Sequence, residues 1–346
     1  MGINNKTTKQ QNNKKTKQTR KCYDREKKLV LVDTHLHLQP FNGPGIPLTK
    51  MVNILHNSGI SYVQGEGIGQ KIVNNPSCYY YLNCPSSEVK PNIENDILNA
   101  ENLKNITKKQ LKGVNINLSM TFPDLSKPET ILKDVKYLNK KYPGVFGWMG
   151  EVNLVKQALF NNKHKPVPIN IIKKWKPFMA YLKKHKMPIS IHSDLGNDSE
   201  PLKYLPLMLE VLKLYPKNKI VWMHLGLSRE LTKINTKEHV DLLDKLLKQH
   251  NNLYFDISWS VLYDAKFKNE LDRKLYVELM NKHPKKFLPG TDFVADIHKT
   301  NKNYKNEVKK TSNILKYVND YAFKSIALGQ NYFDLLNIKI VSPEIC

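Results

Sequence analysis

Histidine and carboxylate side chains follow several short apolar runs of this 346-residue sequence, in positions where they could hold a metal ion. The first run, Leu29–Val32, is followed by Asp33, His35 and His37. Side chains two residues apart on a strand share a face, so these three are expected to point together into one site. Two imidazoles at a strand end can bind one divalent ion, because neutral imidazole suits zinc, iron or manganese.

Polar groups also end four further apolar runs, at Glu151, His192, His224 and Asp292. Each has an ordinary explanation: a buried histidine can bond a backbone carbonyl, and an aspartate can cap a helix. Burying all of them would be costly unless a metal or a catalytic network satisfied them. The sequence therefore predicts one metal site that contains His35, His37, Glu151, His192, His224 and Asp292.

The elements that must position these residues alternate along the chain from Leu29 onwards. Predicted strands are Leu29–His35, Ser61–Glu66, Gly113–Thr121, Val145–Asn153, Pro188–Ser193, Lys219–Leu225, Asn252–Ser258 and Phe287–Asp292. Predicted helices include Thr130–Lys141, Ile171–Lys186, Leu202–Leu214, His239–Gln249 and Asn269–Lys282. Several strand runs are mostly apolar, which suits parallel strands buried on both faces. This order predicts a single α/β domain over residues 29–340, a (β/α)₈ or TIM barrel, whose strand ends converge on one mouth.

Composition adds a basic tail and a high positive charge. Residues 1–28 are rich in Lys, Asn, Gln and Thr and have too few apolar side chains to offset their ordering entropy, so we expect a disordered tail. The formal charge of +24 is spread over lysines in the predicted helices and accompanies a general excess of Lys, Asn and Ile. We therefore do not favour nucleic acid as a partner, although the tail leaves such contacts open.

The cysteines and the hydropathy bear on the compartment. Cys22, Cys78, Cys84 and Cys346 are scattered, without a Cys-x-x-Cys pair, which predicts reduced thiols in a cytosol-like compartment. The sequence has no apolar run of signal-peptide or membrane-spanning length. A cytoplasmic protein without membrane contact is the expectation.

The ordered set of strand-end residues resembles the amidohydrolase superfamily, and most closely its amidohydrolase-related branch, amidohydrolase 2. The resemblance runs from the first strand to the last helix and is poor over about residues 60–140. The segment Gly150–Val152 is also similar to a Gly-Glu-Ile segment of TatD-like nucleases and hydrolases. The stretches that carry the main resemblance are Val32–His37, Pro188–Ser193, Lys219–Gly226, Asn252–Ser258, Leu288–Phe293 and Gly329–Leu336.

The resemblance implies a metal-dependent hydrolase with one or two divalent ions, most simply zinc, with manganese or iron as alternatives. His35 and His37 would bind the first metal, and His192 would be a further ligand. Asp292 would bind metal and accept a proton from the attacking water. His224 would either bind a second metal or polarise the substrate.

Two positions bear on the number of metals and on the surroundings of the ligands. Glu151 stands where two-metal members carry a bridging lysine or glutamate, whereas many amidohydrolase 2 members have no acid there. One ion or two therefore stays open. Asp33 has no metal role in the pattern and is expected behind the ligands, fixing a histidine tautomer.

The expected substrate is a small molecule with an ester, lactone, amide or related bond. Arg229 either pairs with a substrate carboxylate or phosphate or is a surface residue, and Trp259 and the Tyr79–Tyr81 cluster either line the pocket or pack. A non-oxidative decarboxylase of the same branch is the second interpretation. A TatD-like nuclease and a non-catalytic barrel with a basic binding tail are the others. Family members often form homodimers, and the sequence shows no interface signal.

Overall fold

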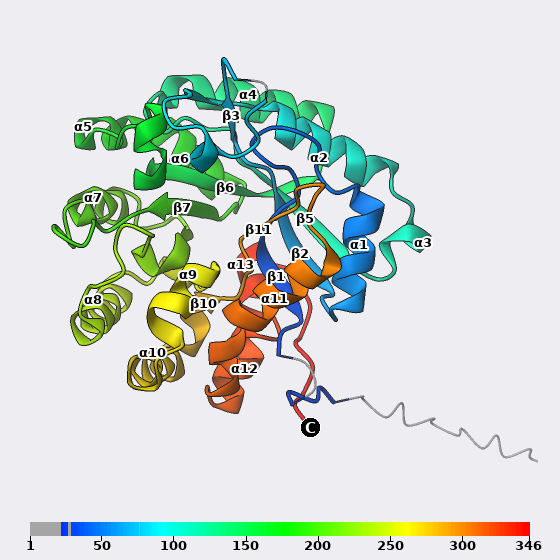
Figure 1. Cartoon of the computed structure of the whole chain (residues 1–346), viewed down its shortest axis with the longest axis vertical. Helices are drawn as coiled ribbons and strands as arrows, with labels where there is room; N and C mark the ends of the chain where they lie inside the picture. Colours follow the sequence, from blue (N-terminus) through cyan, green and yellow to red (C-terminus); the bar gives the residue numbers. More distant parts are fainter. Residues whose placement is uncertain (1–21, 27–28, 76) are drawn as a thin grey trace, which may run out of the picture.

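Parallel strands form one curled sheet at the centre of the computed structural model, which describes residues 22–26, 29–75 and 77–346. Helices surround this sheet as an outer ring (Figure 1). The order of the strands in the sheet is β10-β9-β8-β7-β6-β5-β2-β1-β11. Their bounds are β1 Val32–His37, β2 Tyr62–Glu66, β5 Asn115–Met120, β6 Phe146–Val155, β7 Ile189–Ser193, β8 Ile220–Trp222, β9 Leu253–Asp256, β10 Phe287–Leu288 and β11 Phe293–Val294.

The barrel closes through the predicted eighth strand, Phe287–Asp292, which is present as two short pieces. β10 pairs with β9, and β11 pairs with β1, so one segment joins both edges of the sheet. Between the two pieces, the amide of Thr34 donates to the carbonyl of Pro289 at 3.0 Å, and the amide of Asp292 donates to the carbonyl of His35 at 2.8 Å. The predicted TIM barrel is confirmed.

The helices bury one face each against the sheet. In α4, for example, Ile131, Val135 and Leu138 are buried at helical spacing, while lysines occupy the outer face. The main helices are α1 Leu48–Asn57, α2 Glu94–Asn105, α4 Pro128–Lys141, α6 Lys176–Lys184, α7 Leu205–Leu214, α8 Thr236–Gln249, α10 Glu270–Lys282 and α11 Asn301–Thr311. Shorter helices are α3 Lys108–Leu111, α5 Ile169–Ile172, α9 Ser260–Leu262, α12 Asp320–Ile326 and α13 Gln330–Leu336.

The predicted helix Ile171–Lys186 is divided into α5, the 3₁₀ turn η3 (Lys173–Trp175) and α6. Pro177 at the start of α6 lacks an amide proton, which suits the first turn of a new helix better than the middle of a long one. The turns at the mouth include η1 Tyr81–Asn83, η2 Gln157–Asn162 and η4 Met223–Gly226.

Apolar side chains fill the barrel interior below the mouth and leave the polar residues together above them. Trp148 and Val221 from two strands pack there against Tyr332 and Phe333 of α13. The hydroxyl of Tyr332 donates to the carbonyl of Val63 at 3.3 Å. Helix α13 thus closes the bottom of the barrel, and the opposite end stays available for chemistry.

All four cysteines are paired, so the expectation of reduced thiols was wrong. Cys78 bonds to Cys84 within the loop that follows β2, and Cys22 bonds to Cys346 at the ends of the described chain. The pairing of Cys22 with Cys346 could not be predicted from the spacing of the cysteines, because these two residues are separated by 324 positions. Disulfides persist chiefly in oxidising compartments, so the cysteines no longer support a cytosol-like location.

The bond between Cys22 and Cys346 holds the first described residues on the barrel. The amide of Tyr23 donates to the carbonyl of Glu344 at 2.7 Å, and Arg25 lies 4.5 Å from the ring centre of Phe323. Of the predicted tail of residues 1–28, the structure describes residues 22–26, and the remainder lies outside the described residues. Within the described ranges, no helix is both long and apolar enough to cross a membrane.

Replacement of Cys22 by serine is expected to lower the free energy of unfolding by about 2–4 kcal/mol, because a long loop is no longer constrained in the unfolded chain. Thermal unfolding under oxidising conditions should show a melting temperature lower by several degrees. Cys346→Ser should cause the same loss, and the double variant no further loss. Equal melting temperatures for oxidised wild type and Cys22→Ser would show that this bond does not stabilise the fold.

Candidate metal centre

The six residues expected to bind metal come together at the mouth of the barrel. They form three overlapping groups whose ligand atoms lie within 4.8 Å of one another. His35, His37 and Glu151 form the first group, and Glu151 with His192 and His224 forms the second. His35 and His224 with Asp292 form the third. The groups share members, so the side chains surround one continuous space.

Short distances between nitrogen and oxygen acceptors define that space. The Nε2 atoms of His35 and His37 are 3.2 Å apart. The Oδ1 atom of Asp292 is 3.1 Å from Nε2 of His37 and 3.3 Å from Nε2 of His35. Glu151 faces the same atoms at 3.7 and 3.9 Å through Oε2. Its other oxygen, Oε1, is 3.6 Å from Nε2 of His224 and also contacts Nδ1 of His192.

The hydrogen bond of His37 fixes which of its ring nitrogens carries the proton. Its Nδ1 lies 2.9 Å from the carbonyl oxygen of Gly67, which can only accept. Nδ1 therefore carries the proton, and the neutral ring turns the lone pair of Nε2 towards His35 and Asp292. A metal ligand needs this arrangement.

Ser258 imposes the same tautomer on two further histidines. Its hydroxyl donates to Oδ1 of Asp256 at 2.6 Å, so its oxygen is left to accept. The Nδ1 atoms of His35 and His224 lie 2.9 and 3.1 Å from that oxygen and are therefore the donors. Both Nε2 atoms then present lone pairs to the mouth.

His192 is turned the other way by Asp194. Its Nε2 is 2.9 Å from Oδ1 of Asp194, a carboxylate that also accepts the backbone amide of Gln157 at 2.6 Å. Nδ1 of His192 is consequently the free atom, and it faces Glu151. Four imidazole lone pairs and the carboxylates thus converge as acceptors, and a divalent cation satisfies such a set.

Glu66 is an additional buried carboxylate of the site that the sequence reasoning missed. It ends β2 with 1% of its surface exposed, and its Oε1 is 3.0 Å from Nε2 of His35. Its Oε2 accepts the amide of Glu151 at 2.7 Å. Oε1 has no hydrogen-bond partner among the described atoms, which marks it as a further oxygen available to a cation.

The charges of the site are unbalanced towards the negative. Among the described residues, the ammonium group of Lys156 contacts one of these carboxylates, with Nζ at 3.3 and 3.4 Å from the oxygens of Glu151. Burial lowers the pKa of His35, but the attraction of Glu66, with further carboxylates, outweighs it and holds that pKa well above its usual value. Burial also raises the pKa of Glu66 to about 7. The carboxylates therefore favour positive charge in this cluster, which a divalent ion would supply in place of a proton on His35.

Unusual backbone conformations hold two of the candidate ligands. His224 and Asp292 have φ values of +55° and +57°, a region that is rarely adopted by residues other than glycine. Oδ1 of Asp256 accepts the amide of His224 at 3.1 Å and so holds that turn. Gly290 lets the closing segment approach closely, since an added Cβ would lie 2.7 Å from Cβ of His35.

A cavity of 540 Å³ opens above the ligands. Arg229 and Trp259, both expected to contact substrate, line it, and so do Tyr80 and Tyr81. Tyr79 is instead 47% exposed at the surface. The guanidinium of Arg229 lies 5.6 Å from the ring centre of Trp259, and the Trp259 ring is 4.9 Å from that of His224.

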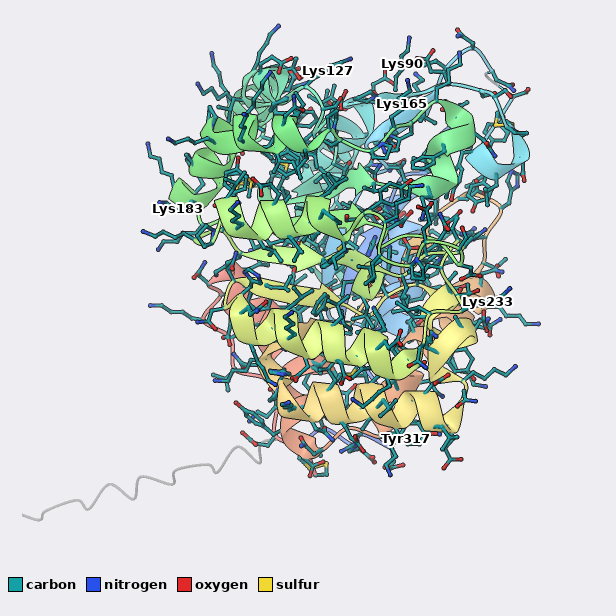
Figure 2. The ribbon with its side chains drawn as sticks, turned by 90° about the vertical axis from the view of Figure 1, so that its left-hand side faces the viewer. Lys90, Lys127, Lys165, Lys183, Lys233 and Tyr317 are labelled. Atoms are coloured by element: carbon teal, nitrogen blue, oxygen red, sulfur yellow. A yellow bond between two sulfur atoms is a disulfide. The ribbon has the colours of Figure 1, made fainter. Side chains whose placement is uncertain are left out.

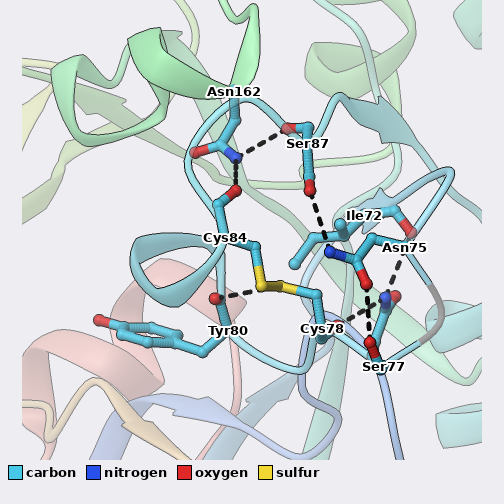
Figure 3. Close-up of a disulfide and its surroundings, with 9 residues drawn as sticks. Ile72, Asn75, Ser77, Cys78, Tyr80, Cys84, Ser87 and Asn162 are labelled. Atoms are coloured by element: carbon cyan, nitrogen blue, oxygen red, sulfur yellow. Dashed lines mark hydrogen bonds between the residues drawn. A yellow bond between two sulfur atoms is a disulfide. The ribbon is translucent and has the colours of Figure 1, made fainter.

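The wall that carries Tyr80 and Tyr81 is a loop held at several points (Figure 3). It begins and ends in the short hairpin of β3 (Gln70–Ile72) and β4 (Val89–Pro91), and the Cys78–Cys84 bond closes its middle. The side-chain amide of Asn162 donates to the carbonyls of Cys84 and Ser87 at 3.0 and 2.7 Å. This loop is therefore a braced wall of the cavity.

Residues 110–304 of the sequence match the amidohydrolase family, and this segment spans more than half of the chain. The chain belongs to the amidohydrolase family. It is a metal-dependent hydrolase, and the matched segment supplies His192, His224 and Asp292 of the site together with Glu151. No curated protein sequence matches this amidohydrolase significantly.

Solved structures share the fold at low sequence identity. Dihydroorotase from Campylobacter jejuni is 14% identical, with a TM-score of 0.54, over 90% of this chain and 84% of that chain. An amidohydrolase from Burkholderia multivorans with bound zinc is 8% identical, with a TM-score of 0.52, over 89% and 99%. A probable 2-pyrone-4,6-dicarboxylic acid hydrolase from Acinetobacter baumannii, with citric acid bound, is 13% identical, with a TM-score of 0.50, over 89% and 99%.

Asp33 does not fix a histidine ring in this amidohydrolase, contrary to expectation. Its carboxylate accepts the amide and hydroxyl of Thr291 at 2.9 and 2.7 Å, and the hydroxyl of Tyr304 at 2.9 Å. It meets His35 only through the backbone amide, at 3.2 Å. Asp33 therefore anchors the segment that carries Asp292, and Ser258 takes the expected role.

Replacement of Ser258 by alanine is expected to weaken metal affinity by about 10–100-fold, because His35 and His224 lose the acceptor that fixes their tautomer. Zinc titration against a competing chelator measures this. The matched control is Ser193→Ala, since Ser193 is also buried but its hydroxyl has no hydrogen-bond partner among the described atoms. Equal zinc affinity in Ser258→Ala and wild type would refute the assigned role of Ser258.

Proposed function

We propose that this amidohydrolase cleaves an ester, lactone or amide bond of a small molecule by activating water at a divalent metal centre. The observation that carries the proposal is the convergence of four imidazole lone pairs with Glu151 and Asp292 below a cavity of 540 Å³. A cavity of this size suits a small organic substrate. A divalent ion bound at this centre would lower the pKa of its coordinated water from about 15.7 towards 7.

The overlap of the groups supports a centre with two ions. Glu151 belongs both to the group with His35 and His37 and to the group with His192 and His224. A carboxylate has two oxygens, and each oxygen of Glu151 faces a different group. We therefore propose two ions with Glu151 between them, and zinc as the metal in view of the imidazole-rich ligands.

The side chains of this protein then have separate tasks. Asp292, whose side chain is 18% exposed at the cavity, takes a proton from the attacking water and delivers it to the leaving group. His224 lies beside Trp259 and orients and polarises the substrate oxygen. Ser258, Asp256 and Asp194 keep the ring nitrogens in the required tautomers.

A substrate panel on metal-reconstituted protein tests the proposal. Protein freed of metal and reloaded with zinc or manganese is given lactones, esters and amides, and acid release is measured. We expect hydrolysis that depends on added metal. Carbon dioxide release from aromatic acids without water consumption would replace the proposal with a decarboxylase, and cleavage of DNA ends would replace it with a nuclease. Stoichiometric metal with no turnover of any class would favour a non-catalytic barrel.

A further inference from the structure

Outside the candidate metal site, the wall of the cavity carries more cationic than acidic side chains. Six cationic side chains line it: Lys90, Lys127, Lys156, Lys163, Lys165 and Arg229. Outside the metal ligands and Asp194, the acidic residues of the lining are Glu88, Asp124 and Glu230. Lys156, Lys163 and Lys165 come from the connection between β6 and α5, whereas Lys90 lies in β4, Lys127 precedes α4 and Arg229 follows η4.

Half of these cations already have a carboxylate partner. Lys90 pairs with Glu88 at 3.7 Å, Lys127 with Asp124 at 3.8 Å, and Lys156 with Glu151 at 3.3 Å. For Lys163, Lys165 and Arg229, no carboxylate of the described chain lies within 4.0 Å. Among the described acidic residues of this wall outside the candidate metal site, only Glu230 has no salt-bridge partner. The unpaired groups therefore leave a net positive charge in the cavity.

Arg229 is the unpaired cation with a defined position relative to the reacting centre. Its guanidinium lies over Trp259, and the Trp259 ring contacts that of His224. Arg229 is thus separated from a metal ligand by a single aromatic ring. A small molecule with its scissile bond at the metal centre can span that distance with an acidic group.

The planar guanidinium presents paired N–H donors that match a carboxylate or phosphate, and its cation–π contact with the Trp259 indole favours this position. We infer that the substrate of this amidohydrolase is an anion whose carboxylate or phosphate group binds Arg229, with Lys163 and Lys165 of the cavity wall adding electrostatic attraction. The inference rests on the proposed hydrolytic function and names its substrate class.

Esters that share one leaving-group scaffold test the inference. They are 4-acetoxybenzoate, the neutral 4-acetoxybenzamide, and 4-acetoxyphenyl phosphate. The zinc-loaded wild type is expected to prefer the anions by about tenfold or more in kcat/KM, the worth of one charge-assisted hydrogen bond. The anion with the higher kcat/KM shows whether the site prefers a carboxylate or a phosphate. In Arg229→Gln, KM for the preferred anion should rise about tenfold with a much smaller change in kcat, and the anion-to-neutral ratio should fall towards one.

Lys183→Gln is the matched control for loss of one positive charge. Lys183 lies near the end of α6, and in Figure 2 it is on the side of the molecule opposite Lys233 of the mouth loops. Its replacement should leave the preference unchanged. Equal kcat/KM for the anionic and neutral esters in the wild type, or an unchanged preference in Arg229→Gln, would overturn the inference while leaving hydrolysis intact.

A binding measurement separates failure of this inference from failure of the proposed function. Terephthalate and its neutral diamide offer no ester to cleave, and calorimetric titration of zinc-loaded protein measures their binding. Terephthalate is expected to bind at least tenfold more tightly to wild type than to Arg229→Gln. If no ester is hydrolysed but this difference is present, the anion site stands and the hydrolase proposal falls. If terephthalate binds both proteins equally, the anion site falls.

Discussion

Replacement of Asp292 by asparagine is expected to lower kcat by about 10³-fold, within the range that general acid–base catalysis contributes. Asparagine keeps the size of the side chain but cannot take a proton from the attacking water. Asp292 also faces His35 and His37 at 3.3 and 3.1 Å, so its amide can still offer one oxygen to the ions. Steady-state kinetics of zinc-loaded protein, with metal content measured on the same samples, tests the effect.

Metal content decides how the result for Asp292→Asn is interpreted. Lost turnover with retained zinc supports a proton-transfer role, and unchanged turnover would defeat the assignment. Asp241→Asn is the matched control, because Asp241 pairs with Lys237 on the exposed surface of α8. It should behave as wild type.

Removal of His35 and His37 together is expected to abolish zinc binding at the group that these two histidines form with Glu151 and, with it, turnover. Both imidazoles contribute Nε2 lone pairs that lie 3.2 Å apart, and both are almost fully buried, so no other side chain can move into their place without disrupting β1. The double variant His35→Ala/His37→Ala should therefore retain at least one equivalent of zinc less than the wild type after reconstitution. Elemental analysis measures this.

The control for the histidine pair is His56→Ala, since His56 is an exposed histidine of α1. Thermal unfolding and circular dichroism of the double variant show whether the barrel is retained. A folded double variant that still binds zinc at wild-type stoichiometry would place the metal elsewhere and refute the ligand assignment.

The fold and the grouping of these side chains at the barrel mouth could be predicted because both depend on simple sequence patterns. Buried parallel strands are apolar along their length, so a polar residue at the end of such a run stands out. His192, His224 and Asp292 were found in this way, and the TIM barrel brings strand ends to one mouth. Glu66 ends a strand in the same manner, but its run of Tyr62–Glu66 contains Gln64 and Gly65 and has a weaker contrast.

The surroundings of the ligands could not be predicted in the same way. Strict alternation placed Asp33 on the face of His35 and His37, but the pairing of β1 with β2 is irregular between Asp33 and Leu36. Asp33 consequently turns to Thr291. Which acceptor a ring nitrogen meets depends on contacts between distant segments, such as Ser258 with His35, separated by 223 positions.

The disulfides and the cation-rich wall also depend on tertiary contacts. Cys22 and Cys346 meet only because the folded barrel brings the two ends of the described chain together. Lys156 immediately follows β6 and pairs with the buried Glu151. Nothing in the sequence distinguishes it from the many lysines that face solvent. Charge counts cannot separate such a lysine from a solvated one.

A crystal structure of the zinc-reconstituted protein, with anomalous diffraction collected at the zinc edge, measures the ligand geometry itself. The expected result is an anomalous peak about 2.0–2.1 Å from Nε2 of His35 and of His37, and a second peak that shares Glu151 with the first. Absence of any peak among these side chains, with zinc bound elsewhere or not at all, would contradict the assignment of the barrel mouth as a metal centre.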